Sequence, residues 1–414
     1  MTLQRILFTF ILCFILMATA ANAAETSLDL PTALQHAFRE NPDLKAKRHS
    51  LGIAQGRAQQ AGLLFQNNPR FSLEVDSPGS GRLGELNLNL LQEVEIAGQR
   101  DHRNEAAEKN LAQANLSVDD AERLLRLEVT QAFYNLLAVQ QAITDLKDVL
   151  AGQENLLQAG QRRFDREDIS ILDLNTLRLD RDQVRNELAN KMRERVSMEK
   201  RLRLLLGFQQ DTPLVAAGDL LQLMTNTSGT IPDRQSLQAC ASANRPDLKA
   251  AKLAVDVREA ELRLAQARRI PNISLGPRYK RDNHENLFGG EIAVPLPFFN
   301  RNQEEITTAL ANRNVSKAEL EGRLLAGKQE VDSVYTKLGL AKEKIEAYGK
   351  TYLGELEKML ALTRKAYESG EMTIFEFSIT RDRFTQARSR FLDAALAYLQ
   401  AMAELEAQAP GCLQ

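Results

Sequence analysis

The sequence predicts a mainly α-helical protein that carries a smaller transmembrane β portion and is built from two copies of one unit. Three observations support this fold class. Short motifs recur at a spacing of about 203 residues. Apolar residues fall at seven-residue steps over long proline-free stretches. Two predicted hairpins alternate apolar with polar residues, as membrane β-strands do.

The start of the chain predicts export. Arg5 precedes an apolar core at 6–17, and small residues flank Asn22 at 21–23, so we expect residues 1–23 to be a signal peptide cleaved after Ala23. A membrane anchor is the less favoured alternative, because the apolar core is shorter than the ~20 residues of a spanning helix. Cys13 lies inside this core and is therefore not a lipidated first residue.

Three motif pairs, in the same order and at matching spacing, show that the chain is duplicated. The pairs are "NPDLKA" (41–46) with "RPDLKA" (245–250), "NPRFSL" (68–73) with "IPNISL" (270–275), and "RFDREDISILDL" (163–174) with "AYESGEMTIFEF" (366–377). The predicted divisions are a first repeat at 24–206, a linker or equatorial segment at 207–236, a second repeat at 237–409 and a tail at 410–414.

Each repeat is expected to hold a moderate helix, a strand hairpin, a very long helix, a short tip and another helix. In the first repeat, Asn41 is expected to cap a helix that runs to about Gln66, and the long helix covers about 101–163. The seven-residue steps are Leu111, Val118, Leu125, Ala132, Val139 and Leu146, then Leu324, Val331, Leu338, Ile345, Tyr352 and Met359, and finally Phe377, Phe384, Phe391, Tyr398 and Leu405.

The strand hairpins are predicted at 70–96 and 272–296, with turns at 77–81 and 282–286. Strands of about ten residues with apolar and polar faces suit a membrane barrel, although any half-buried hairpin also alternates. Four strands cannot close such a barrel, for which about eight is the minimum, and an open edge in lipid leaves backbone groups unpaired. Two chains would supply eight strands and three would supply twelve.

Composition and motifs argue against several classes of function. The formal net charge is -2 with both signs mixed along the chain, so no nucleic-acid surface is indicated. The four histidines are scattered, and we find no nucleophile–base pairing, phosphate loop or metal-ligand spacing. We therefore predict no enzyme, no cofactor and no metal site. Cys240 and Cys412 could form one disulfide in an oxidising compartment, but the sequence leaves this open.

With duplicated halves, four strands, long helices and two tips, the whole mature chain resembles the TolC-type outer-membrane efflux proteins. Within that family, "QEVEIAGQRDHRNEAA" (92–107) and "VPLPFFNRNQEEITTA" (294–309) resemble the heavy-metal, cobalt–zinc–cadmium resistance branch. The resemblance implies a homotrimer in the outer membrane of a Gram-negative bacterium, surrounded by outer-membrane lipid. Twelve strands would form one barrel, continued by a coiled-coil tunnel of helices across the periplasm.

The resemblance also implies a function. The trimer would be a passive exit duct for heavy-metal cations, which an inner-membrane pump of the resistance–nodulation–division type delivers through a periplasmic adaptor, the membrane fusion protein. A multidrug or other organic-efflux duct of the same fold is the alternative. An exported coiled-coil rod or an adaptor protein is less favoured, because a rod would lack the strand hairpins and an adaptor would have one helical hairpin flanked by small β domains.

The tips, at 164–174 and 367–377, are the predicted functional site. Asp173 and Glu376 occupy equivalent positions and match the family's periplasmic gate carboxylates; alternatively, they are ordinary acids at the start of a helix. Met372 stands where the family's gate pattern has an arginine. Glu167 stands where Gly370 would align, so the first tip is expected to be stiffer. The predicted adaptor contacts are Arg166, Glu167, Asp168, Ser369, Gly370, Glu371 and Met372.

A second predicted feature is the bend between barrel and tunnel. Pro295 and Pro297 disfavour both sheet pairing and helix, so they are expected to end the last strand before Asn300 or Asn302 caps the next helix. The first repeat makes the equivalent transition with Ala97 and Gly98. An apolar loop with incidental prolines is the alternative.

Overall fold

The structure is a computed structural model, and it describes residues 26–76, 85–208, 213–226, 231–282, 285–348 and 352–413. The predicted signal peptide, its cleavage site and the turn at 77–81 lie outside these residues. The chain divides into two compact units. One comprises Met1–Pro42, Leu125–Thr230 and Val334–Ala407, and the other comprises Asp43–Leu124, Ile231–Ser333 and Gln408–Gln414.

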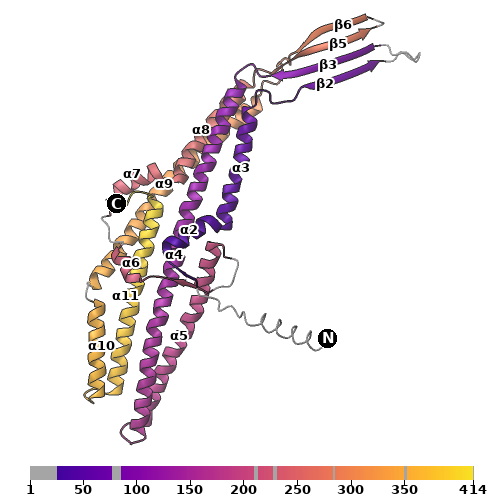
Figure 1. The fold of residues 1–414 in the computed structure, drawn as a ribbon. Coiled ribbons are helices and arrows are strands. Elements are labelled where there is room, and N and C mark those ends of the chain that lie inside the picture. Colours follow the sequence, from indigo (N-terminus) through magenta and orange to yellow (C-terminus); the bar gives the residue numbers. More distant parts are fainter. Residues whose placement is uncertain are drawn as a thin grey trace, which may run out of the picture. The chain divides into compact units, whose positions relative to one another are not determined.

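Helices dominate both units (Figure 1). The helices are α2 (Leu30–Glu40), α3 (Pro42–Gly62), α4 (Gln99–Phe164), α5 (Ile171–Leu206), α6 (Leu220–Asn226), α7 (Arg234–Asn244), α8 (Pro246–Ala267), α9 (Gln303–Tyr348), α10 (Tyr352–Glu368) and α11 (Ile374–Gln408). The strands are β1 (Thr26–Leu28), β2 (Arg70–Asp76), β3 (Glu85–Val94), β4 (Leu214–Ala216), β5 (Ile273–Asp282) and β6 (Glu285–Ala293). In the described part of the chain, no helix combines the length and apolar character needed to cross a bilayer.

The long helix of the first repeat agrees with its prediction to within two residues at each end, since α4 covers 66 residues from Gln99 to Phe164. The heptad residues form its buried side: Val118, Leu125, Ala132, Val139 and Leu146 are all buried. In the second repeat the expected heptad run falls on α9 and α10, with 349–351 outside the described residues. Its last member, Met359, is 53% exposed in the single chain.

The first moderate helix begins directly after Asn41, as predicted, but it ends at Gly62 rather than at about Gln66. A separate helix, α2, precedes it. The Asp29 side chain caps α2 by accepting a hydrogen bond from the Thr32 N–H at 2.9 Å. Asn41, expected to cap the helix that follows, ends α2 and donates its side-chain amide to the Leu205 carbonyl at 2.9 Å. The segment at 207–236 contributes β4, which pairs in parallel with β1.

Four strands form one antiparallel sheet in the order β2-β3-β5-β6 (Figure 1). The turn expected at 282–286 is shorter than predicted, because Asp282 pairs with Glu285 and Arg281 with Asn286. The register separates two faces. Apolar side chains line one face in cross-strand rows, such as Leu73–Leu88–Tyr279–Phe288, and the two rings of the last pair lie 5.0 Å apart.

The apolar face of this sheet lacks the cover that a soluble sheet would have. Phe288 is 83% exposed, and Phe71, Leu73 and Ile292 on the same face are exposed as well. The opposite face carries polar residues such as Asn87, Lys280 and Glu291. The predicted alternation is therefore confirmed in three dimensions, with an apolar side that no other element of the described chain buries.

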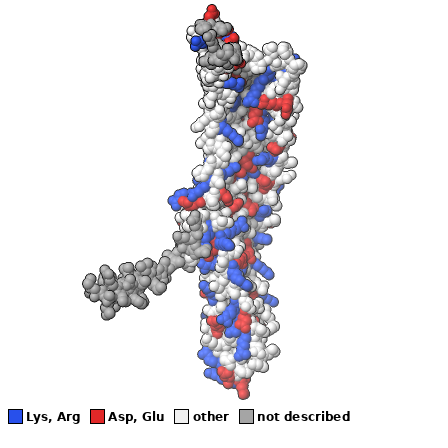
Figure 2. All heavy atoms as spheres, turned by 90° about the vertical axis from the view of Figure 1, so that its right-hand side faces the viewer, with Lys and Arg blue, Asp and Glu red and all other residues white. Residues whose placement is uncertain are grey.

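On the helices, basic and acidic side chains are interspersed over the face seen in Figure 2.

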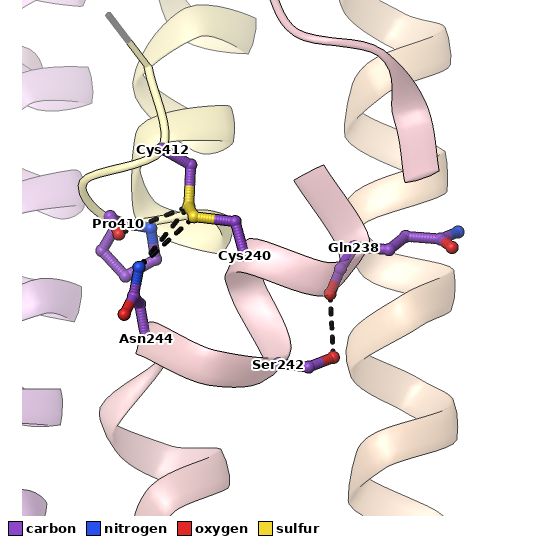
Figure 3. The surroundings of a disulfide bond; sticks show 6 residues. All are labelled: Gln238, Cys240, Ser242, Asn244, Pro410 and Cys412. Carbon is purple, nitrogen blue, oxygen red and sulfur yellow. Dashed lines mark hydrogen bonds between the residues drawn. A yellow bond between two sulfur atoms is a disulfide. The ribbon is translucent and has the colours of Figure 1, made fainter. Parts of the chain in front are cut away.

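The sequence left the state of the two mature cysteines open, and the structure pairs them. Cys240 in α7 and Cys412, just beyond α11, form a disulfide (Figure 3). Arg245, only 4% exposed, reinforces the same connection, because its guanidinium donates to Glu330 at 2.7 Å and to Gln408 at 2.7 Å. Within the unit that holds the sheet, the C-terminal residues are thus fixed by one covalent bond, at Cys412, and by one hydrogen bond from a buried arginine to Gln408.

Replacing Cys240 and Cys412 by serine should lower the free energy of unfolding of this unit by about 2–5 kcal/mol, because the bond closes a long loop in the unfolded chain. The two cysteines are 172 residues apart in sequence. Denaturant titration of the purified protein measures the change. Wild-type protein in dithiothreitol is the matched control and should unfold like the variant. Equal unfolding of the variant and the oxidised wild type would contradict a stabilising disulfide.

Candidate functional site

The unit formed by α4, α5, α10 and α11 has two tips, and both show the same pattern of backbone hydrogen bonds. After α4, the Asp168 N–H donates to the Arg163 carbonyl and the Glu167 N–H to the Phe164 carbonyl, both at 2.9 Å. After α10, Glu371 and Gly370 repeat this pattern with Ala366 and Tyr367. This is the Schellman arrangement, in which the residue just past the helix adopts a left-handed conformation.

Glycine suits that conformation, but only one tip has it. Gly370 has a φ of 80°, and Glu167 in the first tip is held at 62° without a glycine. A side chain in this region costs roughly 1 kcal/mol or more, because Cβ crowds the backbone. Glu167 and Gly370, which align in sequence, therefore also share a left-handed backbone conformation. The first tip keeps this turn although glutamate suits it less well than glycine. Its greater stiffness stays a prediction.

Asp173 and Glu376 each close a capping box three residues into the next helix. The Asp173 carboxylate accepts from the Ser170 N–H at 3.0 Å and from its hydroxyl at 2.7 Å, while the Asp173 N–H donates back to the hydroxyl at 3.1 Å. Glu376 makes the same three contacts with Thr373, at 2.9, 2.8 and 3.3 Å. Both carboxylates therefore have a structural role, as the helix-start alternative expects, and a gate role remains a prediction.

The capping contacts also keep both carboxylates charged. The hydrogen bond from the Ser170 side chain, together with its backbone N–H, lowers the pKa of Asp173 below its ordinary value. The Thr373 backbone N–H, with help from its hydroxyl, lowers the pKa of Glu376. Because the folded-state pKa values are depressed, each cap contributes stability above the unfolded-state pKa and loses it as the pH falls through the folded-state pKa. At neutral and mildly acidic pH both tips are capped and anionic.

An apolar cluster lies directly behind the tips and joins the two helical hairpins. Leu177 of α5 packs with Tyr367, Ile374 and Phe377, and the two aromatic rings lie 5.1 Å apart. Met372, which replaces the arginine of the family's gate pattern, is partly buried against this cluster. The second tip is therefore held by packing at the position where the resemblance leads one to expect a charge.

Sequence reasoning missed the arginines that tie the hairpins together farther along α11. Arg388 donates to both oxygens of Asp145 in α4, at 2.8 and 2.9 Å, and to Glu357 in α10 at 3.2 Å. Arg381, which is buried, lies 3.7 Å from Asp180 in α5. These ions are more than thirty residues apart in sequence, so no local spacing would have revealed them.

The same four helices enclose a groove of about 360 Å³. Apolar side chains such as Val139, Leu360 and Phe384 form part of its wall, and Glu187 and Arg364 line it as well. Arg388 and Asp145 also line this groove, so their ion pair lies on its wall rather than at the far side of the helices.

In the described residues, no group of three or more His, Cys, Asp or Glu side chains is arranged to hold a metal ion.

The predicted bend residues all lie between a strand and a helix. Ala97 and Gly98 separate β3 from α4, and Gly98 has a left-handed φ of 72°. Pro295 and Pro297 lie in the segment between Ala293, where β6 ends, and Gln303, where α9 begins. Both repeats thus interrupt regular structure at the same point, one with a glycine and one with prolines.

The asparagines expected to cap α9 act differently from one another. The Asn302 carbonyl accepts the first helical hydrogen bond, from the Ile306 N–H at 3.1 Å, while its side-chain amide donates to the Ala265 carbonyl at 2.9 Å. The Asn300 side chain accepts from the Asn302 N–H at 2.9 Å and so shapes the turn before the helix.

The chain is duplicated and combines helical hairpins, capped tips and an uncovered amphipathic sheet. This combination is typical of a membrane-associated channel subunit. A model of the outer membrane efflux protein family matches residues 33–208 and 239–409. The chain belongs to this family. It is an outer-membrane channel component with a periplasmic helical tunnel in a Gram-negative bacterium, and it is not an enzyme. Members of the family form trimers in tripartite efflux systems.

Relatives matched by sequence are named for cobalt-zinc-cadmium resistance or for cation efflux. The chain is 24% identical to the cobalt-zinc-cadmium resistance protein CzcC of Cupriavidus metallidurans over 371 residues, which cover 88% of this chain and 86% of CzcC. The crystal structure of CusC superposes with a TM-score of 0.75 at 20% identity, over 92% of each chain. The Campylobacter jejuni CmeC outer membrane channel superposes with a TM-score of 0.73 at 13% identity, over 93% of this chain and 86% of CmeC. These structures share the fold.

Replacing Gly370 by alanine should destabilise the second tip by about 1 kcal/mol, because open space surrounds the position and only the backbone is strained. Glu167→Ala is the matched control and should change the first tip little, since a Cβ is already present there. Hydrogen exchange of the tip amides measures both. Exchange that accelerates equally in the two variants would contradict the left-handed geometry assigned to Gly370.

Proposed function

We propose that three copies of this chain close one twelve-stranded barrel and form a passive exit duct for heavy-metal cations. The observation that supports closure is the sheet itself. Among the described strands, β2 pairs only with β3 and β6 only with β5, so the sheet has two free edges. In hydrocarbon such edges leave several backbone groups without hydrogen bonds, which is prohibitively costly. Pairing β6 of one copy with β2 of the next removes them.

The strand count suits this closure. Four antiparallel strands give β2 and β6 opposite directions, so β6 of one copy and β2 of the next can pair in the same antiparallel sense as the strands within the chain. A heterologous contact of this kind ends only when the rotation closes a ring. Three chains give twelve strands, which matches the trimers of the family. The apolar face then lies against lipid and the polar face lines the lumen.

The charge of the polar face supports cations as cargo. At the hairpin end, Asp76, Glu85, Asp282 and Glu285 are paired in register, so every strand contributes a carboxylate to one row. Lys280 lies 3.0 Å from Glu85 and 3.4 Å from Asp282 and offsets part of this charge. Over the whole polar face the strands carry seven carboxylates (Glu74, Asp76, Glu85, Glu93, Asp282, Glu285, Glu291) and three cations (Arg70, Arg278, Lys280). A lumen with an excess of negative charge favours cations and repels anions.

Neutralising the acidic row by Asp76→Asn, Glu85→Gln, Asp282→Asn and Glu285→Gln should lower the preference for cations over anions several-fold. The reversal potential of single channels in a planar bilayer under a KCl gradient measures this. Arg278→Gln, on the same face, is the control of opposite sign and should raise the cation preference. A quadruple variant with unchanged selectivity would remove the row from the conduction path.

At the tips, we propose that Asp173 and Glu376 form the periplasmic gate. Three copies of each place six carboxylates around the mouth, where low dielectric walls strengthen their field. Their depressed pKa values keep them anionic. We propose the tip residues beside them as the surface for the periplasmic adaptor, which connects the channel to the inner-membrane pump. They are Arg166, Glu167, Asp168, Ser369, Gly370 and Glu371, which are exposed, and Met372, which is partly buried.

Asp173→Asn with Glu376→Gln should reduce cation selectivity at neutral pH, because it removes six charges from the trimer. Ser170→Ala with Thr373→Ala is the matched control, since it removes the caps but leaves the carboxylates. Selectivity measured as above should fall only in the first variant. Wild-type selectivity should also stay constant between pH 7 and pH 5, because both carboxyls titrate below their ordinary range. Equal loss in both double variants would assign these residues to capping alone.

The proposal that the cargo is a metal cation rests on similarity to proteins named for cation efflux and cobalt-zinc-cadmium resistance. A strain that lacks this gene should become more sensitive to cobalt, zinc or cadmium salts, and the intact gene should restore growth. Sensitivity to organic compounds with unchanged metal tolerance would favour the alternative, an organic-efflux duct of the same fold.

A further inference from the structure

The groove enclosed by α4, α5, α10 and α11 contains a polar group that no part of the proposed duct uses. Gln153 of α4 lines this groove and is only 1% exposed. Within the described residues, neither its amide oxygen nor its amide nitrogen has a hydrogen-bond partner. Leaving a buried amide unpaired is costly, so a partner from outside the chain would stabilise it.

An arginine whose charge is not balanced lies close to Gln153. Arg364 of α10 also lines the groove, is exposed, and makes no ion pair in the described part of the chain. Its guanidinium approaches α4 at Gly152, where a Cβ atom would stand 3.2 Å from Nη2. Arg381 of α11 lines the groove as well; Asp382 at 2.7 Å balances its charge, but its buried Nε–H is unpaired. Unused donors from two helices thus accompany the unpaired amide.

The carboxylates that line the groove lie away from this end. Asp145 and Glu357 are both bound by Arg388, at 2.8 and 3.2 Å, and so mark one level of the groove. From Asp145 to Gln153 is about 12 Å along α4, and Arg364 follows Glu357 by two turns of α10. The other lining carboxylates, each separated from its tip by a longer stretch of helix than Gln153 or Arg364, are Asp148, Glu187, Glu194 and Asp393. The end of the groove nearer the tips is therefore cationic.

Between these two levels the groove is apolar. Leu146 and Val149 of α4, Leu360 of α10 and Phe384 of α11 line it there. The volume of about 360 Å³ falls in the range of small-molecule sites, which are mostly apolar with a few polar groups that orient the ligand. The groove thus offers an apolar length that ends at an amide and a guanidinium.

We propose that this groove binds an amphipathic monocarboxylate, such as a medium-chain fatty acid anion, with its carboxylate at Gln153 and Arg364. The Gln153 amide and the guanidinium donate to the carboxylate, and a guanidinium has enough N–H groups to serve the amide oxygen as well. The hydrocarbon chain lies along Val149, Leu360 and Phe384, and the acidic level beyond repels the carboxylate and so fixes its direction. The site lies within one unit of one chain and does not depend on the proposed barrel or cargo.

Octanoate is the probe, because it combines a carboxylate with a short apolar chain. Equilibrium dialysis measures its binding to the full-length protein in lipid nanodiscs, and binding to empty nanodiscs is subtracted. We expect saturable binding that Arg364→Gln weakens about tenfold, because hydrogen bonds to charged groups are the stronger kind. Gln153→Leu should weaken it several-fold. Arg185→Gln, an exposed change in α5 outside the groove, is the matched control and should bind like the wild type.

Thermal unfolding separates lost binding from lost folding. Octanoate should raise the melting temperature of the wild type but not that of Arg364→Gln, because a ligand stabilises the folded protein only where it binds. Without octanoate, Gln153→Leu should be at least as stable as the wild type, because the substitution removes an unpaired buried amide. A variant that folds and no longer binds then locates the site.

Three results would overturn the site. Absence of saturable binding to the wild type would mean that water or a neighbouring chain fills the groove. Equal binding of octanoate to the wild type, Arg364→Gln and Gln153→Leu would place the ligand elsewhere, for example in the bilayer. Binding of octanol as tight as that of octanoate would show that the groove does not recognise a carboxylate.

Discussion

The constraint on which the rest of the structure depends is the pairing of backbone groups at the two edges of the four-stranded sheet. One chain supplies β2 and β6 as free edges, and a bilayer offers no water to satisfy them. The exposed apolar face would also be unfavourable in water, with Phe71, Leu73, Phe288 and Ile292 all uncovered. In the assembly that we propose, copies of the chain complete this sheet and lipid surrounds it. The helices, tips and bends are then parts of an assembly.

Duplication explains why the same local structures occur twice with different residues. Both tips combine a left-handed residue, a hydroxyl cap and an acid at matched positions, although one uses Glu167 where the other uses Gly370. Both bends interrupt the chain between sheet and long helix, one at Gly98 and the other at Pro295 and Pro297. In each case the two repeats share a feature of the backbone, a left-handed turn or an interruption, and different residues provide it in the two copies.

The periodic parts of the fold could be predicted from sequence because their signals are local. Heptad spacing located α4 closely, and alternation located four strands whose register separates an apolar from a polar face. Long-range contacts could not be predicted, since nothing near Arg388 indicates Asp145, and nothing near Cys240 selects Cys412. At the candidate site, the spacing of Ser170 and Asp173 does predict a cap, but only the structure shows that the carboxylate is used for it. The gate role that we propose for this carboxylate depends on copies of the chain that a single sequence does not display.

Cross-linking between neighbouring copies tests the central claim most directly. A cysteine at Ser72 in β2 would be combined in turn with one at Leu287, Gly289 or Glu291 in β6, all on the polar face. Oxidation in outer membranes, followed by denaturing electrophoresis, counts the chains that are joined. The account predicts that at least one pairing yields covalent species of two and three chains and none larger. Monomers alone at every pairing, or a ladder that continues beyond three, would contradict a closed ring of three chains.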